Sequence, residues 1–341
     1  MSLSIQLPPV IFGTSGLGNL YEATPYEVKL QIIKECITHS PTGVAVFDTA
    51  GKYGAGLALE VLGKALKELQ VPKDKVIISN KLGWYQTALT TPEPTFEKGV
   101  WFDLKNDAIQ KISYKGIIEC FQQGNELLGE YNSQMASVHD PDEYLAAAID
   151  AKDEAKRYND ILEAYEALKE LKKAGKVMSI GVGAKNWKSI ERICNDIHLD
   201  WVMIANSLTV HSHPKDLLAF VQKLHEQGTM IINSAVFNGG FLTGREFYNY
   251  AYINPETQEG KALYEWRNKF FSVCKSFNIL PAEACFNFGF RIPGVDSVAL
   301  STTKPDKVKL NIEMATKVIP DEFWHAMVQK GLLEEEHIIL Q

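Results

Sequence analysis

Eight short apolar runs recur along the chain, with mixed polar and apolar segments between them. The runs are rich in Val, Ile, Met or Ala, and most are nearly continuous rather than alternating. That pattern is typical of strands buried on both faces of a parallel sheet. The runs occupy residues 10–15 (VIFGTS), 44–50 (VAVFDTA), 76–81 (VIISNK), 135–140 (MASVHD), 179–184 (SIGVGA), 201–206 (WVMIAN), 229–235 (TMIINSA) and 297–302 (SVALST).

The segments between these runs carry apolar residues every three or four positions, which indicates amphipathic helices. One such segment begins just after Pro25, a residue that favours helix starts. Two others end at Gly175 and Gly228, and glycine is the expected stop signal of a helix. The clearest helical segments span residues 26–39, 57–69, 158–176 and 216–228.

Eight strand–helix alternations predict an α/β fold, the closed (β/α)8 or TIM barrel, as a single domain over residues 1–341. The alternative is an open doubly wound sheet, which would place a glycine-rich phosphate turn after its first strand. Residues 13–18 (GTSGLG) superficially supply that turn. However, they lack the GxGxxG order, and no acidic residue follows at the right strand end to hold a ribose. The barrel is therefore the favoured fold.

Two stretches are too long for ordinary connections in a barrel, residues 84–114 and residues 141–157. Loops of that size in a compact domain are usually functional or disordered. The first forms a long insertion after the third strand, and its many aromatic side chains favour an ordered lid. The second is expected to be a further long loop.

Composition and charge exclude several classes of protein. The formal net charge of −7 argues against a nucleic-acid partner, which would require a basic patch. No apolar run approaches the roughly 20 residues of a membrane span, and the first residues do not look like a secretory segment. Five scattered cysteines without a CxxC pair indicate reduced thiols in a cytoplasmic protein. His211 and His213 are two residues apart without a third ligand nearby, so no metal site is predicted.

Candidate chemistry comes from four polar residues that lie at or near the ends of the second, third and fourth runs. They are Asp48, Tyr53, Lys81 and His139. In a parallel barrel the C-terminal strand ends form the active-site face, so these side chains are expected to meet there. A phenol with a free pKa near 10 is a poor acid or base at neutral pH, and a nearby cation lowers that pKa. The set therefore indicates a proton-transfer site.

The chain resembles the aldo-keto reductases over nearly its whole length, because FDTAGKYG, NKLG and SVHD carry these residues in the order of that family's tetrad. Within the family it is most similar to the aldose 1-dehydrogenase branch, which includes D-threo-aldose (L-fucose) dehydrogenases and pyridoxal dehydrogenase. Three features carry this similarity: the aromatic insertion after Lys81, GVGA at residues 181–184, and Met203 in the sixth run. The resemblance implies an NAD(P) cofactor, no flavin or metal, and direct hydride transfer.

The resemblance also implies a role for each member of the tetrad. Tyr53 is expected to be the acid–base and Lys81 the cation that lowers its pKa. Asp48 is expected to pair with Lys81, and His139 to orient the substrate oxygen.

Cofactor contacts follow from the same resemblance, and they favour NAD slightly over NADP. Lys307 stands where NADPH-dependent members usually carry arginine, and Ser301 where they often carry lysine. A lysine holds a phosphate as a point charge without the bidentate fork of arginine. The aromatic that usually stacks on the nicotinamide is not evident at the end of the seventh run. The expected cofactor residues are Gly13, Thr14, Asp48, Gly183, Ser234, Asn238, Gly239, Ser301, Thr302, Lys307 and Asn311.

The expected function is oxidation of an aldose such as L-fucose or D-arabinose at C1 to the lactone. Aromatic faces suit a sugar ring; the expected substrate contacts are Tyr21, Trp84, Trp101 and Phe102, although these aromatics could instead serve only to pack the insertion onto the barrel. The alternatives are a reductase of small aldehydes, pyridoxal included, and a non-catalytic NADP-binding regulatory subunit. A small-molecule substrate is the only partner expected, and the protein is expected to be a monomer or homodimer.

Overall fold

The structure is a computed structural model that describes residues 5–337. Eight of its strands close into a barrel, in which each strand pairs with the next along the chain and the last pairs with the first. The barrel strands are β1 (Val10–Gly13), β2 (Ala45–Ala50), β3 (Val76–Leu82), β6 (Met135–His139), β7 (Ser179–Ala184), β8 (Trp201–Ala205), β9 (Met230–Ser234) and β12 (Ser297–Leu300). Each of the eight apolar runs matches one of them to within two residues at either end, so the predicted barrel is confirmed and the open sheet is wrong.

The continuous apolar character of the runs matches their burial. Every residue of β2, β6 and β7 is buried, as expected for strands with helices on one face and the barrel interior on the other. The pairs β1–β2, β2–β3, β3–β6 and β6–β7 are all parallel. Consequently the C-terminal ends of these five strands lie at the same edge of the sheet.

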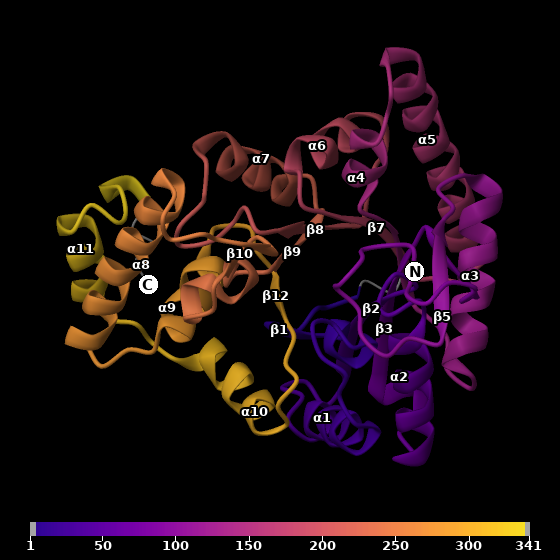
Figure 1. Cartoon of the computed structure of the whole chain (residues 1–341), viewed down its shortest axis with the longest axis horizontal. Helices are drawn as coiled ribbons and strands as arrows, with labels where there is room; N and C mark the ends of the chain where they lie inside the picture. Colours follow the sequence, from indigo (N-terminus) through magenta and orange to yellow (C-terminus); the bar gives the residue numbers. More distant parts are fainter. Residues whose placement is uncertain (1–4, 338–341) are drawn as a thin grey trace. The chain divides into compact units, whose positions relative to one another are not determined.

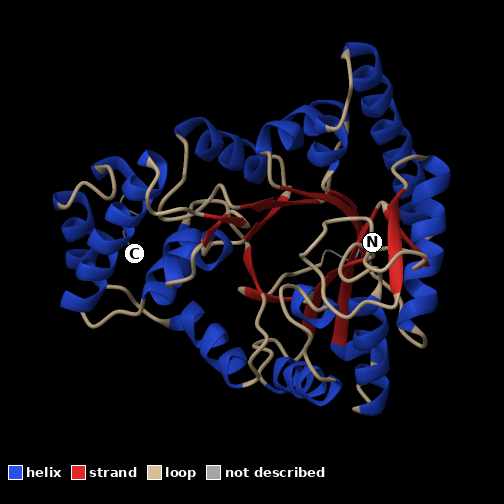
Figure 2. Cartoon of the chain, in the orientation of Figure 1, coloured by secondary structure: helices blue, strands red, loops and turns tan. Residues whose placement is uncertain are grey.

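Helices follow most of the strands, and Figures 1 and 2 show α2 and α3 outside the strands β2 and β3. The predicted helices over residues 26–39, 57–69 and 216–228 are confirmed to within a residue or two. The helices are α1 (Tyr26–Thr38), α2 (Leu57–Glu68), α3 (Tyr114–Leu128), α4 (Pro141–Ala146), α5 (Ala151–Lys173), α6 (Trp187–Asp196), α7 (Lys215–Glu226), α8 (Gln258–Ser276), α9 (Pro281–Arg291), α10 (Asp306–Glu313) and α11 (Asp321–Gln329).

The prediction of a long loop over residues 141–157 is wrong, because this stretch contains α4 and the first two turns of α5. Pro141 occupies the first turn of α4, where its missing N–H costs nothing. The Asp150 side chain accepts a hydrogen bond from the amide of Asp153 and caps α5. Both start signals are local and visible in the sequence.

The insertion after β3 is built on an antiparallel hairpin, β4 (Trp84–Ala88) and β5 (Asn106–Gln110). The loop between these strands is tied down at two points. Asp107 accepts hydrogen bonds from the amide and hydroxyl of Thr95, and Tyr21 donates its amide to the Val100 carbonyl at 2.9 Å. The insertion is therefore an ordered element, as its aromatic content predicts.

The chain divides into two compact units. The first contains the residues up to Met203 together with Ala299–Ile312, and the second contains Ile204–Val298 and the residues from Glu313 onward. The boundary falls inside β8 and β12, so we retain the single barrel domain as a prediction. Among the described residues, no helix is long and apolar enough to cross a membrane.

Candidate active site

The first unit brings the four predicted residues together at one edge of the sheet. Asp48 lies in β2 and Lys81 near the end of β3, and the Lys81 ammonium contacts Asp48 Oδ2 directly. The side chains of both residues are only 4% exposed, so this ion pair is desolvated. A buried lysine needs such a partner to keep its charge.

Tyr53 is held over this pair by a tight turn after β2. Gly54 adopts φ +63°, and a Cβ on it would lie 2.3 Å from the Gly18 carbonyl oxygen, so two glycines allow the backbone segments to touch. The Lys81 Nζ lies 4.8 Å from the centroid of the Tyr53 ring. His139, the last residue of β6, meets the Tyr53 ring edge-on at 5.6 Å between centroids.

Burial controls the charges in this cluster. It raises the pKa of Asp48, although contact with Lys81 opposes the shift. Burial, assisted by the Lys81 and Lys52 cations, holds the pKa of His139 well below its ordinary value, so this imidazole is neutral at physiological pH. Its Nδ1 atom is buried without a hydrogen-bond partner among residues 5–337. A neutral imidazole can donate one hydrogen bond to a substrate oxygen.

The expectation of a lowered pKa for Tyr53 is not met in this structure. Burial raises the pKa of Tyr53 well above its ordinary value, and Asp48 and then Asp140 raise it further. The cation that opposes them is Lys52, the residue before Tyr53, whereas Lys81 is paired with Asp48. Tyr53 is therefore a phenol at neutral pH.

The sequence model of the Aldo/keto reductase family matches residues 9–331. The chain belongs to the aldo/keto reductase family. As a member, this aldo/keto reductase is an NAD(P)-dependent oxidoreductase.

Relatives of known activity are distant but span almost the whole chain. This aldo/keto reductase is 26% identical over 337 residues to the pyridoxal 4-dehydrogenase of Microbacterium luteolum, and the aligned region covers 94% of this chain and 93% of that protein. It is 23% identical over 344 residues to a D-threo-aldose 1-dehydrogenase of a Pseudomonas species, with coverages of 96% and 95%. The solved holo form of an aldo-keto reductase of Bacillus halodurans superposes with a TM-score of 0.69 at 18% identity, over 99% of this chain and 98% of that one. The last similarity supports the fold alone.

Three residues predicted to touch the cofactor of this aldo/keto reductase lie against the strands that carry Asp48 and Lys81. The Thr14 hydroxyl donates a hydrogen bond to the Asp48 carbonyl at 3.0 Å, and Gly13 pairs with Asp48 in the sheet. Gly183 lies beside Lys81, since a Cβ at this position would come 2.9 Å from Lys81 Cδ. All three help to position the Asp48–Lys81 pair, and their contacts with the cofactor stay predictions.

The segment after β12, predicted to contact the cofactor, lies close to the end of β1. A Cβ on Gly13 would lie 3.3 Å from that of Ser301, so the absence of a side chain lets the two strand ends approach closely. Gly13, Thr302 and Asn311 line one narrow cavity with apolar side chains around them. Ser301 and Lys307 are both exposed, the first before α10 and the second within it. Hydroxyls, an ammonium group and a helix N-terminus suit a phosphate.

The remaining predicted cofactor residues lie in the second unit and make contacts within it. Ser234 donates its hydroxyl to the Ile204 carbonyl at 3.3 Å. Asn238 is buried and donates its amide to the Asn206 carbonyl and to Asn249 Oδ1. Gly239, at φ +71°, lets the loop close on itself. Their role toward the cofactor stays a prediction.

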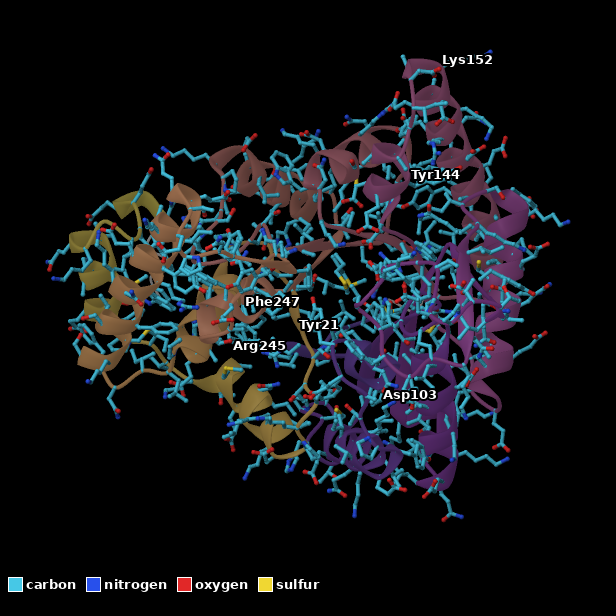
Figure 3. All side chains as sticks on the ribbon, viewed as in Figure 1. Tyr21, Asp103, Tyr144, Lys152, Arg245 and Phe247 are labelled. Carbon is cyan, nitrogen blue, oxygen red and sulfur yellow. The ribbon has the colours of Figure 1, made fainter. Side chains whose placement is uncertain are left out.

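The predicted substrate aromatics divide into packed and exposed residues. Trp101 is 7% exposed and packs with Trp84 in an apolar cluster that also contains Tyr53. Phe102 is 44% exposed, and Tyr21, labelled in Figure 3, is partly exposed with its backbone at φ 63°. Both tryptophans pack the insertion against the Tyr53 turn, and Trp101 lies beside the Tyr53 ring. Contact of the four aromatics with a substrate stays a prediction.

A group of buried and partly buried charges beside the tetrad was not predicted from the sequence. Lys52 precedes Tyr53 and Asp140 follows His139, and both side chains are buried. The sequence did carry a signal for these two residues, because Lys52 stands next to Tyr53 in GKYG and Asp140 stands next to His139 in VHDP. Glu97, Glu143 and Lys185 complete the group and carried no comparable signal.

The histidine pair of the second unit is held by protein partners. His211 Nδ1 lies 2.8 Å from the Tyr248 hydroxyl. His213 contacts the Thr209 carbonyl at 2.9 Å and His337 at 3.0 Å. Across the part of the chain that the structure describes, no three His, Cys, Asp or Glu side chains gather as a metal site would require.

Proposed function

We propose that this NAD(P)-dependent oxidoreductase oxidises an aldose of the L-fucose or D-arabinose type at C1 to the lactone. The observation that carries this proposal is the buried Asp48–Lys81 ion pair beneath the Tyr53 ring, with neutral His139 at the ring edge. In this arrangement the Tyr53 oxygen is the group that exchanges a proton with the substrate, and the adjacent His139 is the hydrogen-bond donor to the substrate oxygen. The similarity to a D-threo-aldose 1-dehydrogenase supports the choice of substrate.

In this reaction the C1 hydroxyl of the sugar loses a proton and C1 loses a hydride. The bound NAD(P) supplies the hydride acceptor. Tyr53 acts in the oxidation as its phenolate, the minor form at neutral pH, and takes the proton on that oxygen. His139 donates a hydrogen bond that orients the reacting oxygen. The Lys81 ammonium, held in place by Asp48, puts a positive charge beside the Tyr53 ring.

Residues of the first unit fit the cofactor's phosphates. In our proposal Ser301, Thr302 and Lys307 hold them and Asn311 contacts the adenine. Lys307 is the one cation in this set, and Ser301 carries no charge, so the set favours NAD slightly.

The test is absorbance of reduced nicotinamide during incubation with NAD or NADP and a panel of aldoses. Tyr53→Phe should lower kcat by about 10² to 10⁴-fold, the usual contribution of general acid–base catalysis, and leave cofactor binding unchanged. Tyr144→Phe is the matched control, since it removes a hydroxyl that donates to Asp160 away from the tetrad. Retention of more than about a tenth of the rate in Tyr53→Phe would contradict the mechanism.

Reduction of a small aldehyde, pyridoxal included, is the second candidate, and the protonated state of Tyr53 favours it. Because the pKa of Tyr53 is raised, the phenol is ready to donate a proton to a carbonyl oxygen at neutral pH. The similarity to a pyridoxal 4-dehydrogenase also supports this class of substrate. Consumption of NADH or NADPH with aldehydes, together with no signal from any aldose, would select this alternative.

A further inference from the structure

A buried ammonium group lies at the centre of the charges beside the tetrad. Lys52 is 3% exposed, and its Nζ contacts Glu97 Oε1 at 2.8 Å, Asp140 Oδ2 at 3.0 Å and Glu143 Oε2 at 2.8 Å. A second cation, Lys185, pairs with Glu143 on the other side. Burial opposes the charge on Lys52, but the three carboxylates outweigh it and raise the pKa of Lys52, so this group is a permanent cation.

These contacts join three segments that are distant in the sequence. Lys52 belongs to the turn that carries Tyr53, and Glu97 belongs to the loop between β4 and β5. Asp140 lies between His139 and the first residue of α4. Glu97 uses both carboxylate oxygens, since Oε2 accepts a hydrogen bond of 2.7 Å from the indole Nε1 of Trp101. Glu97 thus links the loop between β4 and β5 to the Tyr53 turn, in addition to the hydrogen bond that Gln86 of β4 donates to the Ala55 carbonyl.

The hydrogen bond from Trp101 to Glu97 places the Trp101 side chain against Tyr53. Its ring lies 5.9 Å from the Tyr53 ring, at an interplanar angle of 35°. A continuous chain of contacts therefore runs from Lys52 through Glu97 and Trp101 to Tyr53.

Backbone strain indicates that the arrangement is imposed by its contacts. Glu97 has φ 42° and Asp140 has φ 47°, in the left-handed region that favours glycine. Residues stay in such conformations only where the surrounding structure determines them, and they cluster at functional sites. Both residues that deviate here place their carboxylates on the same ammonium group.

We propose that Lys52 and Glu97 form a latch that holds the insertion closed over Tyr53, and that Lys52 is a positioning residue for the proposed reaction. The proposal rests on the proposed role of Tyr53 as the acid–base. The latch fixes the Trp101 indole against the Tyr53 ring and shields the reacting oxygen from water.

The latch also sets the charge around Tyr53. Lys52 lowers the pKa of Tyr53, whereas Glu97 and Asp140 raise it. Removing the Lys52 cation and removing the Glu97 carboxylate should therefore move the pH dependence of the reaction in opposite directions. The other charged or titratable groups that face Tyr53 or Lys52 are Asp48, Lys81, His139, Glu143 and Lys185.

Hydrogen exchange of the insertion tests the latch without any substrate. The amides of Val100 and Phe102 donate to the Glu97 and Asn19 carbonyls at 3.1 Å and report on its opening. Lys52→Met should accelerate their exchange by about tenfold or more, as expected when a closed segment opens locally. Lys67→Met is the matched control, because it removes an exposed partner of Glu130 in the same unit.

Two further variants keep the latch testable even if Lys52→Met does not fold. Glu97→Gln retains an acceptor for the Trp101 indole but loses the negative charge that faces Lys52, so the exchange of the Val100 and Phe102 amides should also accelerate. Lys52→Arg retains the cation and should stay within about threefold of the wild type. Unchanged exchange in both Lys52→Met and Glu97→Gln overturns the latch, whatever the activity of the protein.

The pH profile of kcat/KM in the oxidation direction tests the effect on Tyr53. The rate rises with pH as the phenol loses its proton, and the rise should move to higher pH in Lys52→Met and to lower pH in Glu97→Gln. If the ion cluster served only to stabilise the fold, both variants would have a lower rate and the pH at which the rate rises would not move in opposite directions. That result overturns the positioning role. Faster exchange in a protein that turns over no aldose or aldehyde overturns the proposed function and leaves the latch standing.

Discussion

The Asp48–Lys81 ion pair allows stability and catalysis to be separated by substitution. Both side chains are about 96% buried, since each is 4% exposed. Removing one partner leaves an uncompensated charge, which costs about 3–5 kcal/mol in a buried pair. Lys81→Met and Asp48→Asn should each lower the free energy of unfolding by about that amount. The double variant should lose less than the sum of the two, because neither of its residues carries a charge.

Urea denaturation followed by circular dichroism measures the four free energies of unfolding, and turnover is measured on the same preparations. We expect the double variant to regain stability relative to either single variant but to stay inactive, because the proposed cation beneath Tyr53 is gone. Single substitutions that cost less than about 1 kcal/mol, or additive losses in the double variant, would refute the argument that the pair is buried and coupled.

Three further substitutions probe other parts of the site. The pKa of His139 is lowered well below 6.5 in the folded protein, so the unfolded state binds more protons below that pH and stability must fall as pH falls. Between pH 7 and 5 the wild type should lose about 2 kcal/mol more than His139→Gln in urea titrations, and parallel curves would exclude this origin. Gly54→Ala should lower activity more than tenfold and stability by about 1–3 kcal/mol, because its Cβ would lie 2.3 Å from the Gly18 carbonyl oxygen. Gly129→Ala, at φ +68° with open space around it, isolates the backbone cost, and equal effects of both would refute the close contact. Lys307→Ala should weaken binding of NADP more than of NAD in fluorescence titrations, and equal weakening would place the lysine elsewhere than at a 2′-phosphate.

Patterns in the sequence alone predicted the barrel and four of the polar residues that it brings together. A strand buried on both faces must be apolar at every position, so each barrel strand was visible as a continuous run. Asp48, Lys81 and His139 were conspicuous because each interrupts or ends such a run. The helices at residues 141–157 were also predictable, since Pro141 and Asp150 are local start signals, but the long-loop interpretation overlooked them.

Only the tertiary structure decided the electrostatics of the site. Lys52, Glu97 and Asp140 lie far apart in the sequence, and their meeting depends on how the insertion folds back over the end of β2. The direction in which the pKa of Tyr53 shifts was unpredictable for the same reason. Lys81 was the obvious cation, but the pKa depends on every charge nearby and on burial, and the fold brings more carboxylates than free cations to this ring. A pattern along the chain determines which residues are buried, whereas the charges that a buried group faces are determined by the contacts between distant segments.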